Sequence, residues 1–296
     1  MRRSRSGRAA LAAGALVVSA ATFLAATALQ ATPAAAAAPS ARAAGAGGDF
    51  VARVKPEGKA RVAAAVLDLK GGGRSPSVYG DNARYDTASI VKVDILATAL
   101  LQAQDAGHGL GKKEREQAEV MIRRSDNDAA NALWREIGQA PGLAAGNKRL
   151  GLNRTKGGDG ATWGLTRTTA ADQIRLLRDV FDTRKAARPG STELNKSSRA
   201  YIRNLMGRIA ADQSWGVSAA SGKGYALKNG WLQRSANGLW DVNSIGRVTT
   251  GKGKGKHQYL VAVLSNGSAS MKDGVALVER AAKVAVSAQR TGKPKE

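Results

Sequence analysis

The stretch YDTASIVKVDILATALLQAQDAG, residues 85–107, predicts a helix whose first turn carries polar chemistry and whose remaining turns are buried. Apolar residues recur at helical spacing over residues 90–101, and Gly107 is a natural helix stop. Ser89 and Lys92 are three positions apart, so their side chains lie on one side of the first turn. A serine there lies beside free backbone N–H groups, and an amine one turn away can accept its proton. The stretch therefore suits a nucleophile.

The sequence around this helix predicts strands at both ends of the chain and helices between them. Two strands are expected before it, at residues 61–69 and 77–85. Amphipathic patterns after it predict four helices, at residues 113–123, 129–137, 170–182 and 198–209. The glycine-rich residues 138–168 are expected to be irregular.

Alternating patterns then predict a meander of three strands, at residues 225–232, 239–248 and 258–265, before a final helix at residues 271–289. This order of elements predicts an α+β fold. An antiparallel sheet would be built from both chain ends and flanked by helices, with an all-helical lobe inserted into it.

Three short polar motifs occur in order, each on a different kind of element. They are Ser89-Ile90-Val91-Lys92 at the helix start, Ser125-Asp126-Asn127 between two helices, and Lys228-Asn229-Gly230 on a strand. Each has an ordinary structural explanation, since Ser125 and Asn127 suit helix caps and Lys228 suits a strand end. Together they offer more, because Lys228 near Lys92 would disfavour the charged form of Lys92 and make it a better proton acceptor.

In order and element type, the motifs resemble the Ser-x-x-Lys, Ser-Asp-Asn and Lys-Thr-Gly signature of serine β-lactamases and penicillin-binding proteins, class A β-lactamases in particular. The resemblance covers about residues 61–289. It implies an exported serine hydrolase, without a cofactor or metal, that forms an acyl-enzyme at Ser89 with β-lactams or related amides or esters. The catalytic residues it implies are Ser89, Lys92, Ser125 and Lys228. The substrate-binding residues it implies are Asn127, Asn229, Gly230 and Trp231.

The same resemblance implies a role for each side chain. Ser125 would relay a proton to the leaving nitrogen, and Asn127 would bind the side-chain amide of the substrate. Lys228 would orient Ser125 and attract the substrate carboxylate. The backbone N–H groups of Ser89 and Trp231 would hold the oxyanion.

The chain departs from the family pattern in two places that bear on activity. Class A members carry a deacylating glutamate on an irregular loop, but residues 151–168 contain no glutamate. Their only carboxylate is Asp159, inside a Gly-Gly-Asp-Gly run that is typical of a turn. Asn229 stands where the family has threonine or serine. We therefore expect slow deacylation. Two alternatives stay open: a D-Ala-D-Ala peptidase or esterase of the same fold, and a non-catalytic module that binds the cell wall or senses β-lactams.

The N-terminus has the order of a secretory signal peptide. Four arginines precede an uncharged run over residues 9–29, and an Ala-rich stretch follows. We expect a signal peptide at residues 1–38, a linker and N-terminal segment at 39–60, the hydrolase domain at 61–290 and a tail at 291–296. The expected location is secreted or extracytoplasmic, with an uncleaved membrane anchor as the alternative.

Composition narrows the chemistry and the partners. The 296 residues include no cysteine and two histidines, which excludes disulfides and argues against thiolate or histidine metal sites. The net charge is +23, and removing the four signal arginines leaves +19. For an exported chain with few aromatic residues, this charge favours an anionic cell wall over nucleic acid. The densest basic stretch, residues 251–257, is expected to be a solvated hairpin tip. We expect a monomer that acts on a small β-lactam or a peptidoglycan-type substrate.

Overall fold

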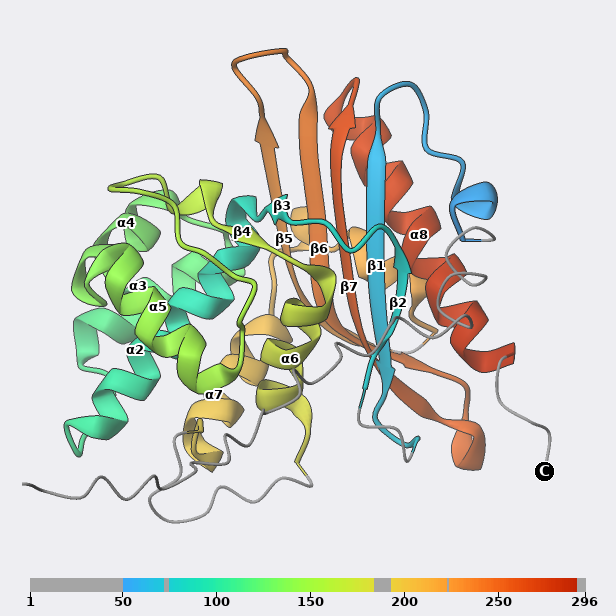
Figure 1. Ribbon diagram of the computed structural model, residues 1–296. Helices are drawn as coiled ribbons and strands as arrows, with labels where there is room; N and C mark the ends of the chain where they lie inside the picture. The colour runs from blue at the N-terminus through green and yellow to red at the C-terminus, as the bar shows by residue number, and fades with distance from the viewer. Residues whose placement is uncertain (1–49, 72–74, 184–192, 223, 292–296) are drawn as a thin grey trace, which may run out of the picture. The chain divides into compact units, whose positions relative to one another are not determined.

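The computed structural model describes residues 50–71, 75–183, 193–222 and 224–291 (Figure 1). The predicted signal peptide, half of the predicted linker and N-terminal segment, and nearly all of the predicted tail lie outside these residues. A five-stranded antiparallel sheet has the strand order β2-β1-β7-β6-β5. Its strands are β1 (Arg61–Asp68), β2 (Ser77–Gly80), β5 (Tyr225–Gln233), β6 (Trp240–Thr250) and β7 (His257–Ser268). A second sheet pairs β3 (Tyr85–Asp86) with β4 (Arg167–Thr168).

The sheet joins the two ends of the domain, as predicted. Strand β1 pairs along its whole length with β7, and Ala64 lies opposite Val263. Alternate residues of β1 belong to different hydrophobic clusters: Ala63 and Ala65 face one cluster, whereas Val62 and Val66 face the other. The sheet is therefore buried on both faces, and the α+β prediction is confirmed.

Helices cover the two faces unequally (Figure 1). Helix α8 (Met271–Thr291) packs on one face together with the short helix η4 (Gly216–Ala220). The other face carries α6 (Ala170–Phe181) and the helical lobe. The lobe consists of α2 (Val91–Asp105), α3 (Lys112–Arg123), α4 (Asn127–Glu136), α5 (Gln139–Leu150) and α7 (Lys196–Met206). Helix α2 is buried almost all round, because other elements of the domain pack against it on several sides.

Helix α5 corrects the prediction that residues 138–168 are irregular throughout. Its glycines serve packing rather than flexibility. A Cβ atom on Gly146 would lie 2.4 Å from the hydroxyl of Thr98 on α2, and one on Gly142 would lie 1.6 Å from the Ile137 carbonyl. Close approach to α2 and to the end of α4 therefore stabilises a helix that local propensity disfavours. The helix ends at Gly151, whose φ of 71° suits a glycine.

The domain also begins before the predicted residue 61. Residues 50–54 are helical, and the side chains of Phe50 and Val54 are buried in the cluster beneath α8. Among the helices that the structure describes, none combines the length and the apolar character needed to cross a membrane.

Candidate active site

Ser89 lies in a short 3-10 helix, η1 (Ala88–Ile90), directly before α2. Ala88 has a φ of 46°, a left-handed conformation that is uncommon for any residue except glycine. Such strain is typical of functional turns, where the surrounding structure enforces it. Ser89 is partly exposed, and its hydroxyl makes no hydrogen bond within the described part of the chain. This hydroxyl is therefore open to a ligand.

A buried asparagine, Asn243 of β6, ties the Ser89 turn to the main sheet. Its amide nitrogen donates to the carbonyls of Asp86 at 2.9 Å and Thr87 at 3.1 Å. Its amide oxygen accepts from the backbone N–H of Ser265 at 3.0 Å. Sequence reasoning missed Asn243. The sequence could have indicated Asn243 in one way: a polar amide side chain inside a strand that is buried on both faces needs hydrogen-bond partners.

Gly230 brings strand β5 against the same turn. A Cβ atom on Gly230 would lie 2.6 Å from the backbone nitrogen of Ser89 and 2.7 Å from that of Ile90. Only glycine permits this approach. β5 is an edge strand of the sheet. Trp231 follows Gly230 at this edge.

The structure brings the other two motifs to the same place. The Lys92 amine donates to the Ser125 carbonyl at 2.6 Å, to the amide oxygen of Asn127 at 2.7 Å and to the Ser125 hydroxyl at 3.3 Å. The Lys228 amine donates to the Ser125 hydroxyl at 2.9 Å. Ser125 has a φ of 59°, so its backbone is also left-handed. Its hydroxyl thus lies between two amines that come from different elements.

Burial makes both lysines poor cations. Burial lowers the pKa of Lys92 from 10.5 to about 7, although the negative charge of Asp126 opposes this. Burial, and then the charge of Lys92, hold the pKa of Lys228 well below its ordinary value. The sequence suggested that Lys228 lowers the pKa of Lys92, but burial is the cause that lowers it.

A tryptophan completes the surroundings of Lys92. The centre of the Trp163 ring lies 4.8 Å from the Lys92 amine. Such a contact favours the ammonium by about 0.5–2 kcal/mol, which raises a pKa by at most about 1.5 units. Burial has the larger effect, so Lys92 can be neutral near pH 7.

Residues 151–168 form an ordered loop beside the nucleophile turn. Lys156 and Arg167 exchange two backbone hydrogen bonds of 2.9 Å, and the Trp134 indole donates to the Gly160 carbonyl at 2.7 Å. The Asp159 carbonyl accepts from the Thr162 N–H at 3.0 Å, which confirms the predicted turn. The Asp159 side chain is exposed and contacts no polar group among the described residues.

A cavity of about 500 Å³ opens between the start of α4, residues 161–165 and residues 232–236. Asn127 and Trp163, both in contact with Lys92, line it together with Arg234. The cavity therefore opens next to two residues that contact the Lys92 amine.

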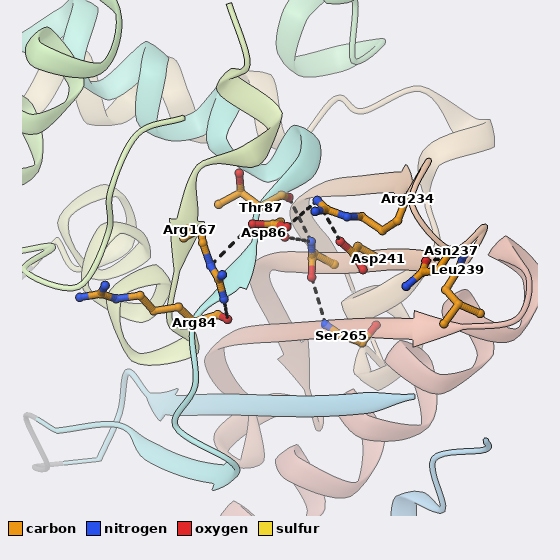
Figure 2. Close-up of polar contacts among 10 residues, drawn as sticks. Arg84, Asp86, Thr87, Arg167, Arg234, Asn237, Leu239, Asp241 and Ser265 are labelled. Atoms are coloured by element: carbon orange, nitrogen blue, oxygen red, sulfur yellow. Dashed lines mark hydrogen bonds and ion pairs between the residues drawn. The ribbon is translucent and has the colours of Figure 1, made fainter. Parts of the chain in front are cut away.

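Arg234, which lines the cavity, belongs to a group of charged residues around Asp86, three residues before Ser89 (Figure 2). The Arg234 guanidinium donates to the Asp86 carboxylate at 2.6 Å, and Arg167 lies 3.7 Å from the other carboxylate oxygen. Arg234 also lies 3.9 Å from Asp241, whose pKa burial raises to about 6 against the effect of Arg234. This cluster joins the β5–β6 hairpin to β3 and β4. The sequence offered no signal for it, because its members are far apart in the chain.

Asn229 requires a correction. Its side chain is fully buried, and its amide nitrogen donates to the carbonyls of Gln213 at 2.8 Å and Trp215 at 3.0 Å. Side chains alternate between the two faces of a strand, and Asn229 faces away from Ser125. The prediction that Asn229 contacts the substrate does not fit this placement. Within the described residues, no group of three acidic or histidine side chains is arranged to hold a metal ion.

Comparisons with known proteins agree on the family and the fold. The sequence profile described as the beta-lactamase enzyme family matches residues 113–289, more than half of the chain. This match begins after Ser89 and Lys92, whose assignment therefore depends on their motif and on the geometry above. The sequence has no match among curated proteins.

Three solved structures illustrate the fold. The TLA-1 extended-spectrum β-lactamase is similar with a TM-score of 0.68 and 16% identity, over 82% of this chain and 97% of that one. A variant of PBP-A in an acyl-enzyme complex with penicillin G is similar with a TM-score of 0.66 and 18% identity, over 84% of this chain and 97% of that one. A class A β-lactamase from Bacteroides cellulosilyticus DSM 14838 is similar with a TM-score of 0.66 and 15% identity, over 82% of this chain and 96% of that one. At these identities the likeness shows the fold alone.

Proposed function

The chain belongs to the beta-lactamase enzyme family, and from this premise we propose that it is a serine hydrolase that forms an acyl-enzyme at Ser89. Family and fold support a serine β-lactamase-like hydrolase. The observation that carries the proposal is the position of the Ser125 hydroxyl between two buried amines, next to a turn that leaves the Ser89 hydroxyl unbonded. A binding module has no need of two costly buried lysines.

The proposed first half-reaction uses these groups in sequence. The Ser89 oxygen attacks the carbonyl carbon of an amide, and the neutral Lys92 amine takes the hydroxyl proton. The carbonyl electron pair moves onto its oxygen, where the backbone N–H groups of Ser89 and Trp231 would stabilise the charge. The C–N bond then breaks, and the leaving nitrogen takes the proton through Ser125. The product is an ester of Ser89.

The proposed substrate is a β-lactam or a related amide or ester. PBP-A, a protein of the same fold, has been captured in a variant form as an acyl-enzyme with penicillin G. Arg234 places positive charge at the wall of the cavity, which suits a substrate that carries a carboxylate. Asn127, at the cavity wall, is available to an amide of the substrate.

We propose that hydrolysis of the ester is slow. A base that activates water contributes a factor of about 100 to 10,000. Asp159, the only carboxylate in residues 151–168, is exposed, and among the described residues its side chain has no hydrogen-bond partner that would orient it. The Trp163 ring, which lies over Lys92, offers no carboxylate that could serve as this base.

Intact-protein mass spectrometry with penicillin G tests the proposal. We expect one adduct of the mass of penicillin on the wild-type chain, persisting for many minutes, and none on Ser89→Ala. A peptide that ends in D-Ala-D-Ala, tested in parallel, identifies peptidase activity through release of D-alanine. An adduct on Ser89→Ala would place the nucleophile elsewhere. If the wild type gains no mass and cleaves no peptide or ester, the chain is a binding module.

We also propose export, which the sequence of residues 1–38 supports. The mature domain would then meet an anionic cell wall with a net charge of +19 after loss of four arginines. Sequencing of the mature N-terminus in the culture medium tests this. A start at Met1 in cell membranes would instead indicate an uncleaved anchor. Sedimentation analysis tests the expected monomer.

A further inference from the structure

Lys92 is fully buried although a cavity of about 500 Å³ opens next to its partners. Asn127, which accepts from the Lys92 amine, lines this cavity, and so does Trp163, whose ring centre is 4.8 Å from the same amine. Lys92 is not one of the described residues that line the cavity. The Trp163 ring therefore stands between the amine and the solvent of the cavity.

The position of this ring is built into the fold. The Trp163 indole N–H donates to the amide oxygen of Asn131 at 2.8 Å, and the Trp163 carbonyl accepts from the Thr166 N–H at 3.0 Å. Asn131 follows Asn127 by four residues, one helical turn, so one face of α4 holds both the lysine and the ring that covers it.

We propose that Trp163 is a positioning residue whose ring keeps water away from the Lys92 amine and so keeps that amine uncharged and ready to take the Ser89 proton. This inference rests on the proposed function, in which Lys92 is the proton acceptor. The proton leaves the Ser89 oxygen and joins the Lys92 nitrogen, which becomes an ammonium. The ring face attracts that ammonium, which offsets part of the desolvation, and the desolvation is the larger of the two effects.

Two other charged groups act on Lys92. Lys228, from β5, shares the Ser125 hydroxyl with it, and Asp126, at the start of α4, favours its ammonium form. Both remain when the ring is removed. The solvation of Lys92 is what changes, and desolvation is the main cause of its lowered pKa.

Titration of Lys92 by NMR tests the proposal directly. The lysine side chains are labelled with carbon-13, and the Lys92 signal is assigned through its loss in Lys92→Ala. We expect a midpoint of about 7 in the wild type and a similar midpoint in Trp163→Phe, which keeps an aromatic cover. In Trp163→Ala the midpoint should rise by about one pH unit or more toward the ordinary lysine value, because water reaches the amine.

Leu165→Ala is the matched control, since Leu165 belongs to the same 3-10 turn, lines the same cavity and is 39% exposed. Its Lys92 midpoint should equal that of the wild type. If Trp163→Ala fails to fold, Trp163→Leu gives a smaller rise in the same direction. An unchanged or lower midpoint in the folded Trp163 variants overturns the proposal, and so does a wild-type midpoint near 10.

The titration needs no reaction, so its result is separate from that of the penicillin experiment. A chain whose Lys92 midpoint rises in Trp163→Ala, but which gains no penicillin mass, contradicts the hydrolase alone. A chain that is acylated at Ser89, but whose midpoint ignores Trp163, contradicts the role of Trp163 alone.

Discussion

Ser125 is the residue at which the chemistry of this site converges. Its hydroxyl accepts from the amines of Lys92 and Lys228, and its carbonyl accepts from Lys92 as well. A buried ammonium is costly unless it is neutralised or well bonded. Because of this cost, the pKa values of both buried lysines are lowered. The Lys92 amine can therefore act as a base at neutral pH.

The first prediction at the residue scale concerns pH. Lys92 must be neutral to take a proton, and its pKa is about 7. The rate constant for acylation by a β-lactam should therefore rise through pH 7 and level off above it, with about a tenfold lower value at pH 6 than at pH 8. Stopped-flow measurement of acyl-enzyme formation from pH 5.5 to 9 checks this. A rate that falls as the pH rises would show that the base is not a lysine.

A second prediction at this scale concerns the two amines together. Lys92→Ala and Lys228→Ala should each slow acylation by about a thousandfold or more, because both belong to one proton-transfer unit. The double variant should be little slower than either single one. Lys148→Ala, on the exposed surface of α5, should acylate at the wild-type rate. Losses that multiply in the double variant would mean that the two amines act independently.

At the scale of elements, the site depends on how closely β5 approaches the nucleophile turn. Gly230→Ala places a Cβ atom 2.6 Å from the Ser89 nitrogen, so β5 or the turn must move. We expect acylation to fall at least about 100-fold, as when one oxyanion donor is lost, while the chain stays folded. Gly109→Ala, which meets no atom within 4 Å, is the matched control. If Gly230→Ala is acylated at the wild-type rate, the close approach of β5 to the Ser89 turn is not needed for acylation.

The loop over residues 151–168 carries the prediction on deacylation. With a chromogenic β-lactam we expect a burst of about one equivalent and then slow turnover. Asp159→Asn should leave both phases nearly unchanged, because the Asp159 side chain is exposed and unbonded among the described residues. If Asp159→Asn halts turnover and the acyl-enzyme accumulates, Asp159 is the base. A linear trace with fast turnover would refute slow deacylation altogether.

At the scale of the whole molecule, a second buried group makes stability depend on pH. Asp94 of α2 is fully buried, and burial, followed by the charge of Asp172, raises its pKa from 3.8 to about 8. The folded chain therefore keeps a proton on Asp94 that the unfolded chain has lost between about pH 4 and pH 8. Over that range the Asp94 contribution to stability decreases as the pH rises.

Asp94→Asn should remove this contribution, since an amide stays neutral at every pH. The free energy of unfolding of Asp94→Asn, relative to the wild type, should be larger at pH 8 than at pH 5. Urea unfolding of both proteins at the two pH values measures the difference. The lowered pKa of Lys92 makes its own contribution to stability rise with pH, but this effect cancels in the comparison because both proteins contain Lys92. A relative stability that is equal at both pH values would mean that Asp94 is ionised in the folded chain.

The sequence by itself determined the order of elements and the three motifs. Helical and alternating periods predicted the sheet from both chain ends and the inserted lobe, because those periods reflect which face of each element is buried. The residues Ser89, Lys92, Ser125 and Lys228 could be selected because their types and element positions matched one chemistry. This selection needed no knowledge of which residues contact one another in the fold.

Only the tertiary structure decided what surrounds those residues. Asn243, Trp163 and Asp86 lie far apart in the chain, and their contacts follow from how strands and loops pack. Helix α5 was missed because glycines that disfavour a helix locally permit its close contact with α2. The prediction placed the Asn229 side chain at the substrate, but it lies on the opposite face of β5, and the face on which each strand residue lies depends on how the strand is set in the sheet. Burial, which no single residue specifies, is what turns Lys92 from a surface cation into a base.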